Sequence, residues 1–378
     1  MIWPNRALFA ATVILLSAPM EAAAQTPFNV KSGGAQTDAS DGTRTRAAIV
    51  EIENIAAKAG PEQEAVESVF MLSQGAIKRL ARIGASAILD IKNVLADPAK
   101  DWKAKAMMCE ALGGINDVGS AALLEQILQD SGQHEFVRAV AGHALAAMGR
   151  PDSARVIERI VSSKNTPSKI RARTMMAVGA TGLDDVDWLK RAALGEGIEF
   201  HAGKELSQEQ AQEEAGIILN AQRALGTSNN PKALDALIEL QDQHPTNSIL
   251  AEILARKKDP RSVPVLLKVL TYQSPGRRGS LTPGYAATAL GDMKAAQALE
   301  PLIRIVEKDS DELLVGRAAL ALANIGDKRA IEPIKNVVAH MHSDQRFTYA
   351  GDSYFAQEKI GGGPLPMLKK ALDQLTKK

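Results

Sequence analysis

Residues 289–302, Ala-Leu-Gly-Asp-Met-Lys-Ala-Ala-Gln-Ala-Leu-Glu-Pro-Leu, align without a gap with residues 321–334, Ala-Leu-Ala-Asn-Ile-Gly-Asp-Lys-Arg-Ala-Ile-Glu-Pro-Ile, at an offset of 32. A period of this length is typical of stacked helix pairs, in which each pair is one repeat. The residue aligned with Ala330 recurs along the chain, and we place it at Ala87, Ala122, Ala154, Asp187, Ala233, Ser262, Ala298 and Ala330. The pattern predicts an all-α fold, an α-solenoid rather than a domain closed around one core.

The turn inside each repeat carries signals that end one helix and start the next. In Gly326-Asp327, the glycine suits a left-handed C-cap, and the aspartate can accept amide hydrogens of the following helix. Pro264, Pro301 and Pro333 fall in the first turn of the second helix, where a missing amide hydrogen costs little. These signals predict a first helix of the form Ala-x-x-Ala-Leu and a second helix after the turn.

The N-terminus has the pattern of a secretory signal peptide. Arg6 precedes an apolar run from Ala7 to Ala18, and three alanines end at Ala24. The apolar run of 12 residues is shorter than the roughly 20 needed to span a bilayer. We therefore predict a signal peptide at 1–24, a disordered leader at 25–43, a repeat solenoid at 44–342, and a C-terminal cap with a terminal helix at 343–378. We expect the protein to be periplasmic or secreted, with no membrane span after cleavage.

The recurring turn, Ala-Leu packing and early proline resemble the short HEAT-like repeats first described in bilin lyases, over roughly residues 62–342. The resemblance implies a right-handed superhelix of helix pairs. It implies little about activity, because such repeats serve many functions. Bilin lyase activity itself conflicts with the predicted signal peptide, since the substrates of those enzymes are cytosolic.

Composition limits the remaining function classes. The chain has 378 residues, is 45% hydrophobic and 4% aromatic, and has a formal net charge of +1. The low aromatic content fits packed helices better than a β-rich fold, and the net charge provides no field that would recruit nucleic acid or an anionic membrane. Cys109 is the only cysteine, so no internal disulfide can form, and we interpret it as a packing residue.

Signatures of catalysis are nearly absent. The chain has no Walker loop, dinucleotide fingerprint, His-Glu-x-x-His or Gly-x-Ser-x-Gly motif. HEAT-repeat iron hydroxylases use several His-Glu pairs, whereas this chain has the single pair His134-Glu135. His340 and His342, with Asp344 nearby, could bind a metal together only if the helix frays, because positions i and i+2 point apart. The sequence therefore favours a protein that is no enzyme and has neither a metal nor a cofactor.

Three stretches interrupt the repeat, at about 195–212, 273–284 and 342–366. Within 195–212, residues 195–203 read as a loop, and Ser207 as the N-cap of a helix. Charge is uneven as well: residues 184–215 have a net charge of −6 and residues 256–278 one of +6. These runs are either solvated faces or complementary patches for a partner or a second copy of the chain.

The leading hypothesis is an exported protein-binding scaffold that acts through a concave surface lined by the second helices. The candidate partner contacts are the polar residues on those helices: Lys92, Glu125, Gln129, Arg155, Arg159, Lys268, Arg304 and Lys335. A second hypothesis is an enzyme or a cofactor-handling or metal-handling protein that uses the irregular segments 195–212 and 342–363. A third is a structural protein that self-assembles through its oppositely charged runs.

Overall fold

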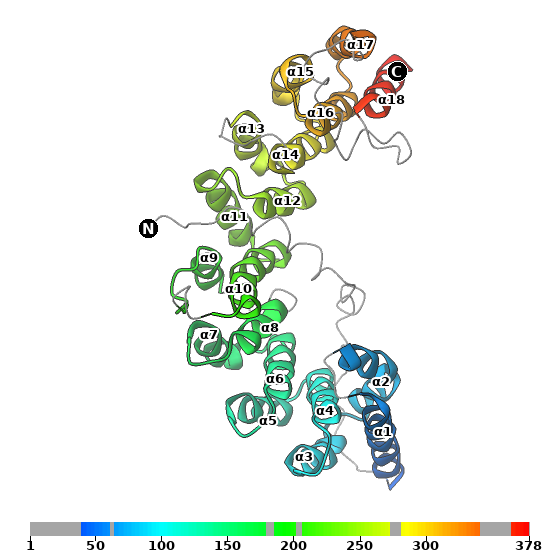
Figure 1. Ribbon diagram of the computed structural model, residues 1–378, viewed down its shortest axis with the longest axis vertical. Helices are drawn as coiled ribbons and strands as arrows, with labels where there is room; N and C mark the ends of the chain where they lie inside the picture. Colours follow the sequence, from blue (N-terminus) through cyan, green and yellow to red (C-terminus); the bar gives the residue numbers. More distant parts are fainter. Residues whose placement is uncertain are drawn as a thin grey trace. The chain divides into compact units, whose positions relative to one another are not determined.

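The computed structural model describes residues 39–60, 64–178, 185–201, 206–272, 281–340 and 364–377. Helices and short connections account for these residues, with no β-strand among them, which confirms the predicted all-α class. The chain divides into unit 1, which ends at Asn229, and unit 2, which begins at Asn230. Each unit is a row of helix pairs (Figure 1). The predicted signal peptide lies outside the described residues.

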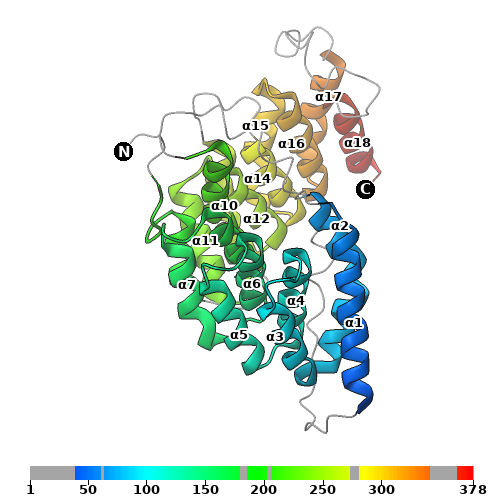
Figure 2. The ribbon, with the colours of Figure 1, turned by 60° about the horizontal axis from the view of Figure 1, so that its bottom comes forward.

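Unit 1 begins with a pair of long helices and continues as two parallel rows. Its helices are α1 (Ala39–Lys58), α2 (Glu64–Ile83), α3 (Ile88–Ala96), α4 (Trp102–Ile115), α5 (Val118–Gln129), α6 (Glu135–Ala147), α7 (Ala154–Ser162), α8 (Ser168–Val178), α9 (Val186–Ala193) and α10 (Gln208–Thr227). The first helices α4, α6, α8 and α10 pack one on the next, and we call them the inner row. The second helices α3, α5, α7 and α9 pack on that row from one side and form the outer row, of which α3, α5 and α7 can be followed in Figure 2.

Unit 2 repeats this arrangement. Its helices are α11 (Pro231–Gln243), α12 (Ser248–Lys257), α13 (Val263–Thr271), α14 (Leu281–Asp292), α15 (Leu299–Lys308), α16 (Glu312–Ile325), α17 (Ile331–His340) and α18 (Pro364–Thr376). Helices α12, α14, α16 and α18 pack in sequence. The terminal helix α18 buries Leu368, Ala371 and Leu375, so apolar side chains of the last helix face the stack. No described helix is both long and apolar enough to cross a bilayer.

The turns follow the predicted chemistry. Gly326 ends α16 with φ 84°, in the left-handed region that glycine tolerates. The Asp327 carboxylate accepts a hydrogen bond from the Arg329 amide, and a short 3₁₀ turn then ends at the buried Ala330. Similar turns end at Ala87, Ser262 and Ala298, each of which is fully buried. The small residue at this point lets the turn lie against the inner helix.

The predicted register is wrong at three repeats. Ala122 and Asp187 are exposed, and Ala154 is only half-buried. Ser120 and Ser153 occupy the buried position instead, with exposed fractions of 0% and 1%. A serine fits here because it is small, and at Ser153 the hydroxyl donates to the Glu125 carboxylate at 2.9 Å. Aligning the repeats on alanine therefore shifted the register by one or two residues.

The predicted concave side is also wrong for unit 1. Figure 1 shows α3, α5, α7 and α9 along the outside of the curved row, and α4, α6, α8 and α10 along its inside. Small residues explain this curvature: a Cβ added to Gly142 would lie 2.2 Å from Thr174 Oγ1, and one added to Gly113 would lie 3.0 Å from Ala144 Cβ. Because the inner helices approach one another this closely, the row bends toward them.

Two predicted segment limits differ from the structure. Helix α1 begins at Ala39, within the stretch predicted as leader. Helix α14 begins at Leu281, within the stretch predicted as a long turn, and it tolerates Pro283 because the first turn of a helix needs no amide donor there. Thr282 Oγ1 also donates to the Thr246 carbonyl at 3.1 Å, which fixes the start of this helix.

Candidate functional site

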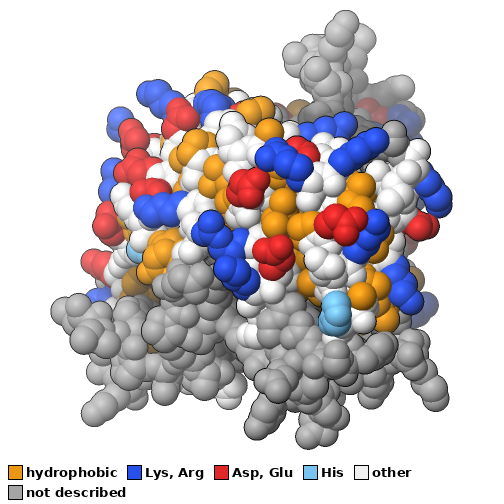
Figure 3. All heavy atoms as spheres, turned by 90° about the horizontal axis from the view of Figure 1, so that it is seen from above, with side chains coloured by type: hydrophobic (Ala, Val, Ile, Leu, Met, Phe, Trp, Pro, Cys, Tyr) orange, Lys and Arg blue, Asp and Glu red, His pale blue; other side chains and the backbone are white. Residues whose placement is uncertain are grey.

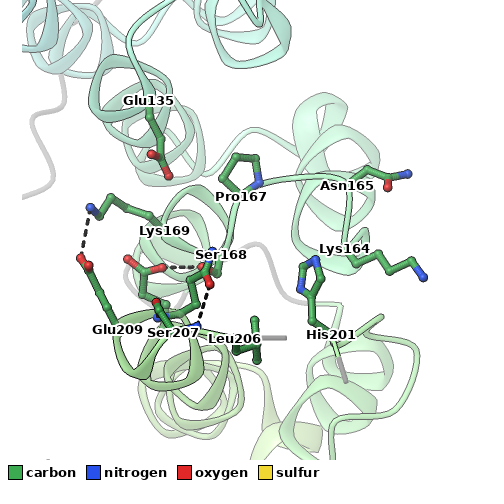
Figure 4. Close-up of a pocket in the computed structure, with 12 residues that line it drawn as sticks. Glu135, Lys164, Asn165, Pro167, Ser168, Lys169, His201, Leu206, Ser207 and Glu209 are labelled. Carbon is green, nitrogen blue, oxygen red and sulfur yellow. Dashed lines mark hydrogen bonds and ion pairs between the residues drawn. The ribbon is translucent and has the colours of Figure 1, made fainter. Parts of the chain in front are cut away.

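The inner row of unit 1 is interrupted once, between α9 and α10, and an open groove lies beside this interruption (Figure 4). The groove has a volume of about 480 Å³. Glu135 at the start of α6, the connection from α7 to α8, His201 and the first turns of α10 form its walls. Its lining residues are Glu135, Lys164, Asn165, Pro167, Ser168, Lys169, His201, Leu206, Ser207, Glu209, Gln210 and Glu213.

A fully buried arginine holds the irregular segment 195–201 beside this groove. Arg171 has an exposed fraction of 0%. It donates from Nη1 to Glu214 Oε1 at 3.1 Å and from Nη2 to the Glu199 carbonyl at 2.8 Å. The guanidinium also lies 5.7 Å from the Phe200 ring centroid. One cation therefore links α8, α10 and the irregular segment, and we call these contacts the Arg171 anchor.

The Arg171 anchor is built on an ordinary repeat contact. Arg171 Nε donates to the Val161 carbonyl at 2.8 Å, where α7 nears its end. One repeat earlier, Arg138 Nε donates to the Leu128 carbonyl at 3.1 Å in the same way. Arg138 remains half-buried and makes no ion pair among the described residues. Arg171 therefore keeps the carbonyl contact of Arg138 and, beside the interruption, also forms a buried ion pair with Glu214.

His201 ends the described part of this segment and faces the groove. Its Nδ1 lies 2.8 Å from Glu214 Oε1. Because an ionised carboxylate can only accept, Nδ1 is the donor in this contact. Ser207 begins α10 with a capping box to Gln210, which confirms the predicted helix start.

The carboxylates at one end of the groove are incompletely compensated. Glu209 pairs with Lys169 at 3.4 Å. Glu213 accepts a hydrogen bond from the Ser168 hydroxyl. Burial raises the pKa of Glu213, the Ser168 hydrogen bond and Lys169 lower it, and the neighbouring carboxylates of Glu209 and Glu135 raise it again. This end of the groove therefore favours a positive charge.

Aromatic and basic side chains continue along the inner row from the groove. Trp102 stacks on His134, with ring centroids 4.3 Å apart, and meets Phe136 edge-on at 5.6 Å. The Arg173 guanidinium lies 4.5 Å from the Phe136 ring centroid. These contacts join α4 to α6 and α6 to α8. Aromatic and arginine side chains of this kind are enriched at protein interfaces.

His134 has a structural role that its sequence pattern did not reveal. Its Nδ1 accepts a hydrogen bond from the Phe136 amide at 3.2 Å, so the ring caps α6. Partial burial lowers the pKa of His134, which favours the neutral ring that this bond requires.

Among the described residues, no group of three His, Cys, Asp or Glu side chains is arranged to hold a metal ion. His342 and Asp344, the other members of the weighed His340 cluster, lie outside the described residues.

The predicted contact residues lie on the expected helices but do not meet at one site. They are distributed over α3, α5, α7, α13, α15 and α17, the second helices of their repeats. Several have partners: Glu125 binds Ser153, Lys268 pairs with Asp242 at 2.6 Å, and Lys335 with Glu332 at 2.9 Å. In unit 1 these residues belong to the outer row.

The basic run at 256–278 is not a basic patch in the fold. Four of its described cations pair with carboxylates, and three of these pairs run across repeats: Arg261 with Asp235 at 3.1 Å, Lys258 with Asp292 at 2.8 Å and Lys268 with Asp242 at 2.6 Å. Arg256 pairs with Glu252 within α12, and Arg277 and Arg278 lie outside the described residues. Figure 3 shows basic and acidic side chains interspersed over the face seen from above.

Cys109 is buried, with an exposed fraction of 0%, as expected for a packing residue.

One comparison with known proteins identifies the type of repeat. The family model for HEAT repeats matches residues 88–179 and 280–348. The match shows HEAT repeats in these two segments. Among solved structures, human deoxyhypusine hydroxylase in complex with glycerol matches at 18% identity, over 88% of this chain and 99% of that chain, with a TM-score of 0.26. So low a TM-score supports no argument. No curated protein matches the chain.

Proposed function

We propose that this chain is an exported protein-binding scaffold that contacts its partner through the inner row of unit 1. The observation that carries the proposal is the groove beside the Arg171 anchor. One buried guanidinium donates three hydrogen bonds, one each to α7, α10 and the irregular segment, and the groove beside them has polar walls and is open to solvent. The adjoining surface of Trp102 and His134 supplies half-buried and exposed rings, which make effective anchors at protein interfaces.

Site-specific crosslinking in the native envelope tests this proposal. A photoreactive amino acid replaces Glu135 or Lys164 on the groove, and Lys92 or Arg155 on the outer row as matched exposed controls. We expect a discrete crosslinked product from the groove positions that the outer-row positions do not give. Equal products from both rows, or none from either, would contradict the proposal.

Export is the second part of the proposal and is tested separately. The N-terminal pattern favours cleavage after Ala24. We expect fractionation to recover a mature protein whose first residue is Gln25. A full-length protein in the cytosolic fraction would contradict export. It would leave the groove proposal to the crosslinking result.

The observations favour self-assembly through the charged runs less, because four of the described cations of the basic run are paired within the fold. The contact that orients His201 against Glu214 is the observation in favour of the enzymatic alternative. Among the described residues, no group of three His, Cys, Asp or Glu side chains could hold a metal ion beside that pair.

A further inference from the structure

Helix α18 continues the inner row of unit 2 beyond the matched repeats. The family match ends at residue 348, whereas α18 covers Pro364–Thr376. It packs on α16 and α17, in the place that the first helix of a further repeat would take (Figure 1). We call the face of α16 and α17 that α18 covers the α18 site.

The contact has the form of a helix in a groove. Leu368, Ala371 and Leu375 are the buried residues of α18, at positions i, i+3 and i+7 on one face of the helix. Amphipathic helices that bind into apolar grooves of partner proteins use anchors at this spacing. The α18 site therefore selects a helix with apolar residues in this pattern.

Gly316 on α16 allows the first turn of α18 to come close. A Cβ added to Gly316 would lie 2.6 Å from Met367 Sδ and 3.4 Å from Pro364 Cα. Because Gly316 is buried and has no side chain, the backbone of α16 forms the floor of the α18 site at this point. A large side chain at position 316 should therefore block the site for any helix.

Helix α18 buries fewer residues than the inner helices before it. Three of its side chains are buried, whereas α14 and α16 bury eight residues each. Leu365 and Leu372, two further apolar residues of α18, are only half-buried. In a repeat array, an element with few buried contacts opens at a lower free energy than the well-packed elements beside it. Helix α18 can therefore leave its site while α14 and α16 stay folded.

We propose that the α18 site is a second interaction surface, which binds an amphipathic helix of a partner protein when α18 leaves it. The partner helix has apolar residues at the spacing of Leu368, Ala371 and Leu375. Helix α18 is then an intramolecular competitor, because an element of the same chain is present at its own site at an effective concentration on the order of millimolar. This inference concerns unit 2 and is independent of the groove in unit 1.

Binding of an external helix tests the inference. The probe is a fluorescent peptide of residues 364–377, and fluorescence polarisation measures its binding to the full chain. The double variant Leu368→Glu/Leu375→Glu should empty the site, because it places charges at two buried positions of α18. We expect this variant to bind the peptide at least about tenfold more tightly than the wild-type chain, in which α18 competes. Adding Gly316→Leu to the double variant should abolish binding.

Lys369→Ala/Gln374→Ala is the matched control, because both residues are exposed on the same helix. It should bind the peptide no more tightly than the wild-type chain. Hydrogen exchange of the wild-type chain gives a second measurement that depends on no variant: α18 should lose protection at a lower free energy than α14 and α16.

Equal binding by the wild-type chain and the double variant, or binding that survives Gly316→Leu, would overturn the inference. Exchange of α18 only together with α16 in the wild-type chain would overturn it as well, because α18 would then not leave separately. Loss of protection throughout α14 and α16 in the double variant would have the same consequence, because the site would not persist without its own helix.

Discussion

Replacing Arg171 by methionine should open the irregular segment of unit 1 at a large energetic cost. Arg171 is fully buried and donates to Val161, Glu199 and Glu214 at 2.8, 2.8 and 3.1 Å. Hydrogen bonds to charged groups contribute about 1.5–3 kcal/mol each, but these three share one charge and do not add. Removing one partner of a buried ion pair costs about 3–5 kcal/mol, because the other charge stays buried alone. We expect a loss of about 4 kcal/mol.

Arg138→Met is the matched control. Arg138 occupies the same repeat position and makes the same carbonyl contact, at 3.1 Å to Leu128, but it is half-buried and without the ion pair. Its replacement should cost about 1.5 kcal/mol. The double variant Arg171→Met/Glu214→Leu should recover part of the Arg171 loss, because no uncompensated carboxylate then remains.

Native-state hydrogen exchange is the assay, because it reports opening free energies for separate elements of a repeat array. In Arg171→Met, protection should fall in residues 195–201, α8 and the first half of α10, and remain unchanged in α14 and α16. An Arg171→Met loss no larger than that of Arg138→Met would refute the anchor argument. Equal loss of protection in both units would refute its local character.

Three further predictions concern packing and protonation. Gly291→Ala should destabilise unit 2 by about 1–3 kcal/mol, because the new Cβ would lie 2.5 Å from Ala321 Cα. Gly216→Ala should stabilise α10 by about 0.5–1 kcal/mol, because no heavy atom lies within 4 Å of the new Cβ. Urea titrations of the two variants measure both changes in the free energy of unfolding. Leu322→Ala should cost about 2–5 kcal/mol and loosen neighbouring repeats only, as seen by hydrogen exchange. Burial lowers the pKa of His143 in the folded protein, although the Glu110 carboxylate opposes this shift. The stabilising contribution of the neutral His143 ring is therefore present above about pH 6.5 and is lost as the pH falls through the lowered pKa of the folded state. In His143→Gln, the melting temperature should fall less steeply below about pH 6.5.

The fold could be predicted because its determinants are local. Gly326, Asp327 and Ala330 lie within five residues of one another, and each acts through its own backbone geometry or size. Errors arose where two residue types satisfy the same requirement. Ser153 fills the buried position as well as alanine does, so an alignment based on alanine selected Ala154 instead.

The site could not be predicted in the same way, because its determinants lie far apart in the sequence. Glu214 is 43 residues from Arg171, and Asp235 is 26 residues from Arg261. A local window therefore counts Arg261 as part of a basic run, although its charge is compensated by the preceding repeat. The sequence does have an arginine at the equivalent position of two successive repeats, Arg138 and Arg171, but the neighbouring residues of neither arginine indicate which of the two is fully buried.

The direction of curvature connects the fold to the proposed function. Gly113 and Gly142 allow α4, α6 and α8 to approach one another closely, so side chains from successive inner helices converge on the inside of the row. Trp102, His134 and Phe136 form one cluster at the starts of α4 and α6. The interruption at 195–201 then adds walls that regular repeats lack. A binding surface is therefore expected where close helix packing and the irregular segment coincide, which is the groove beside Arg171.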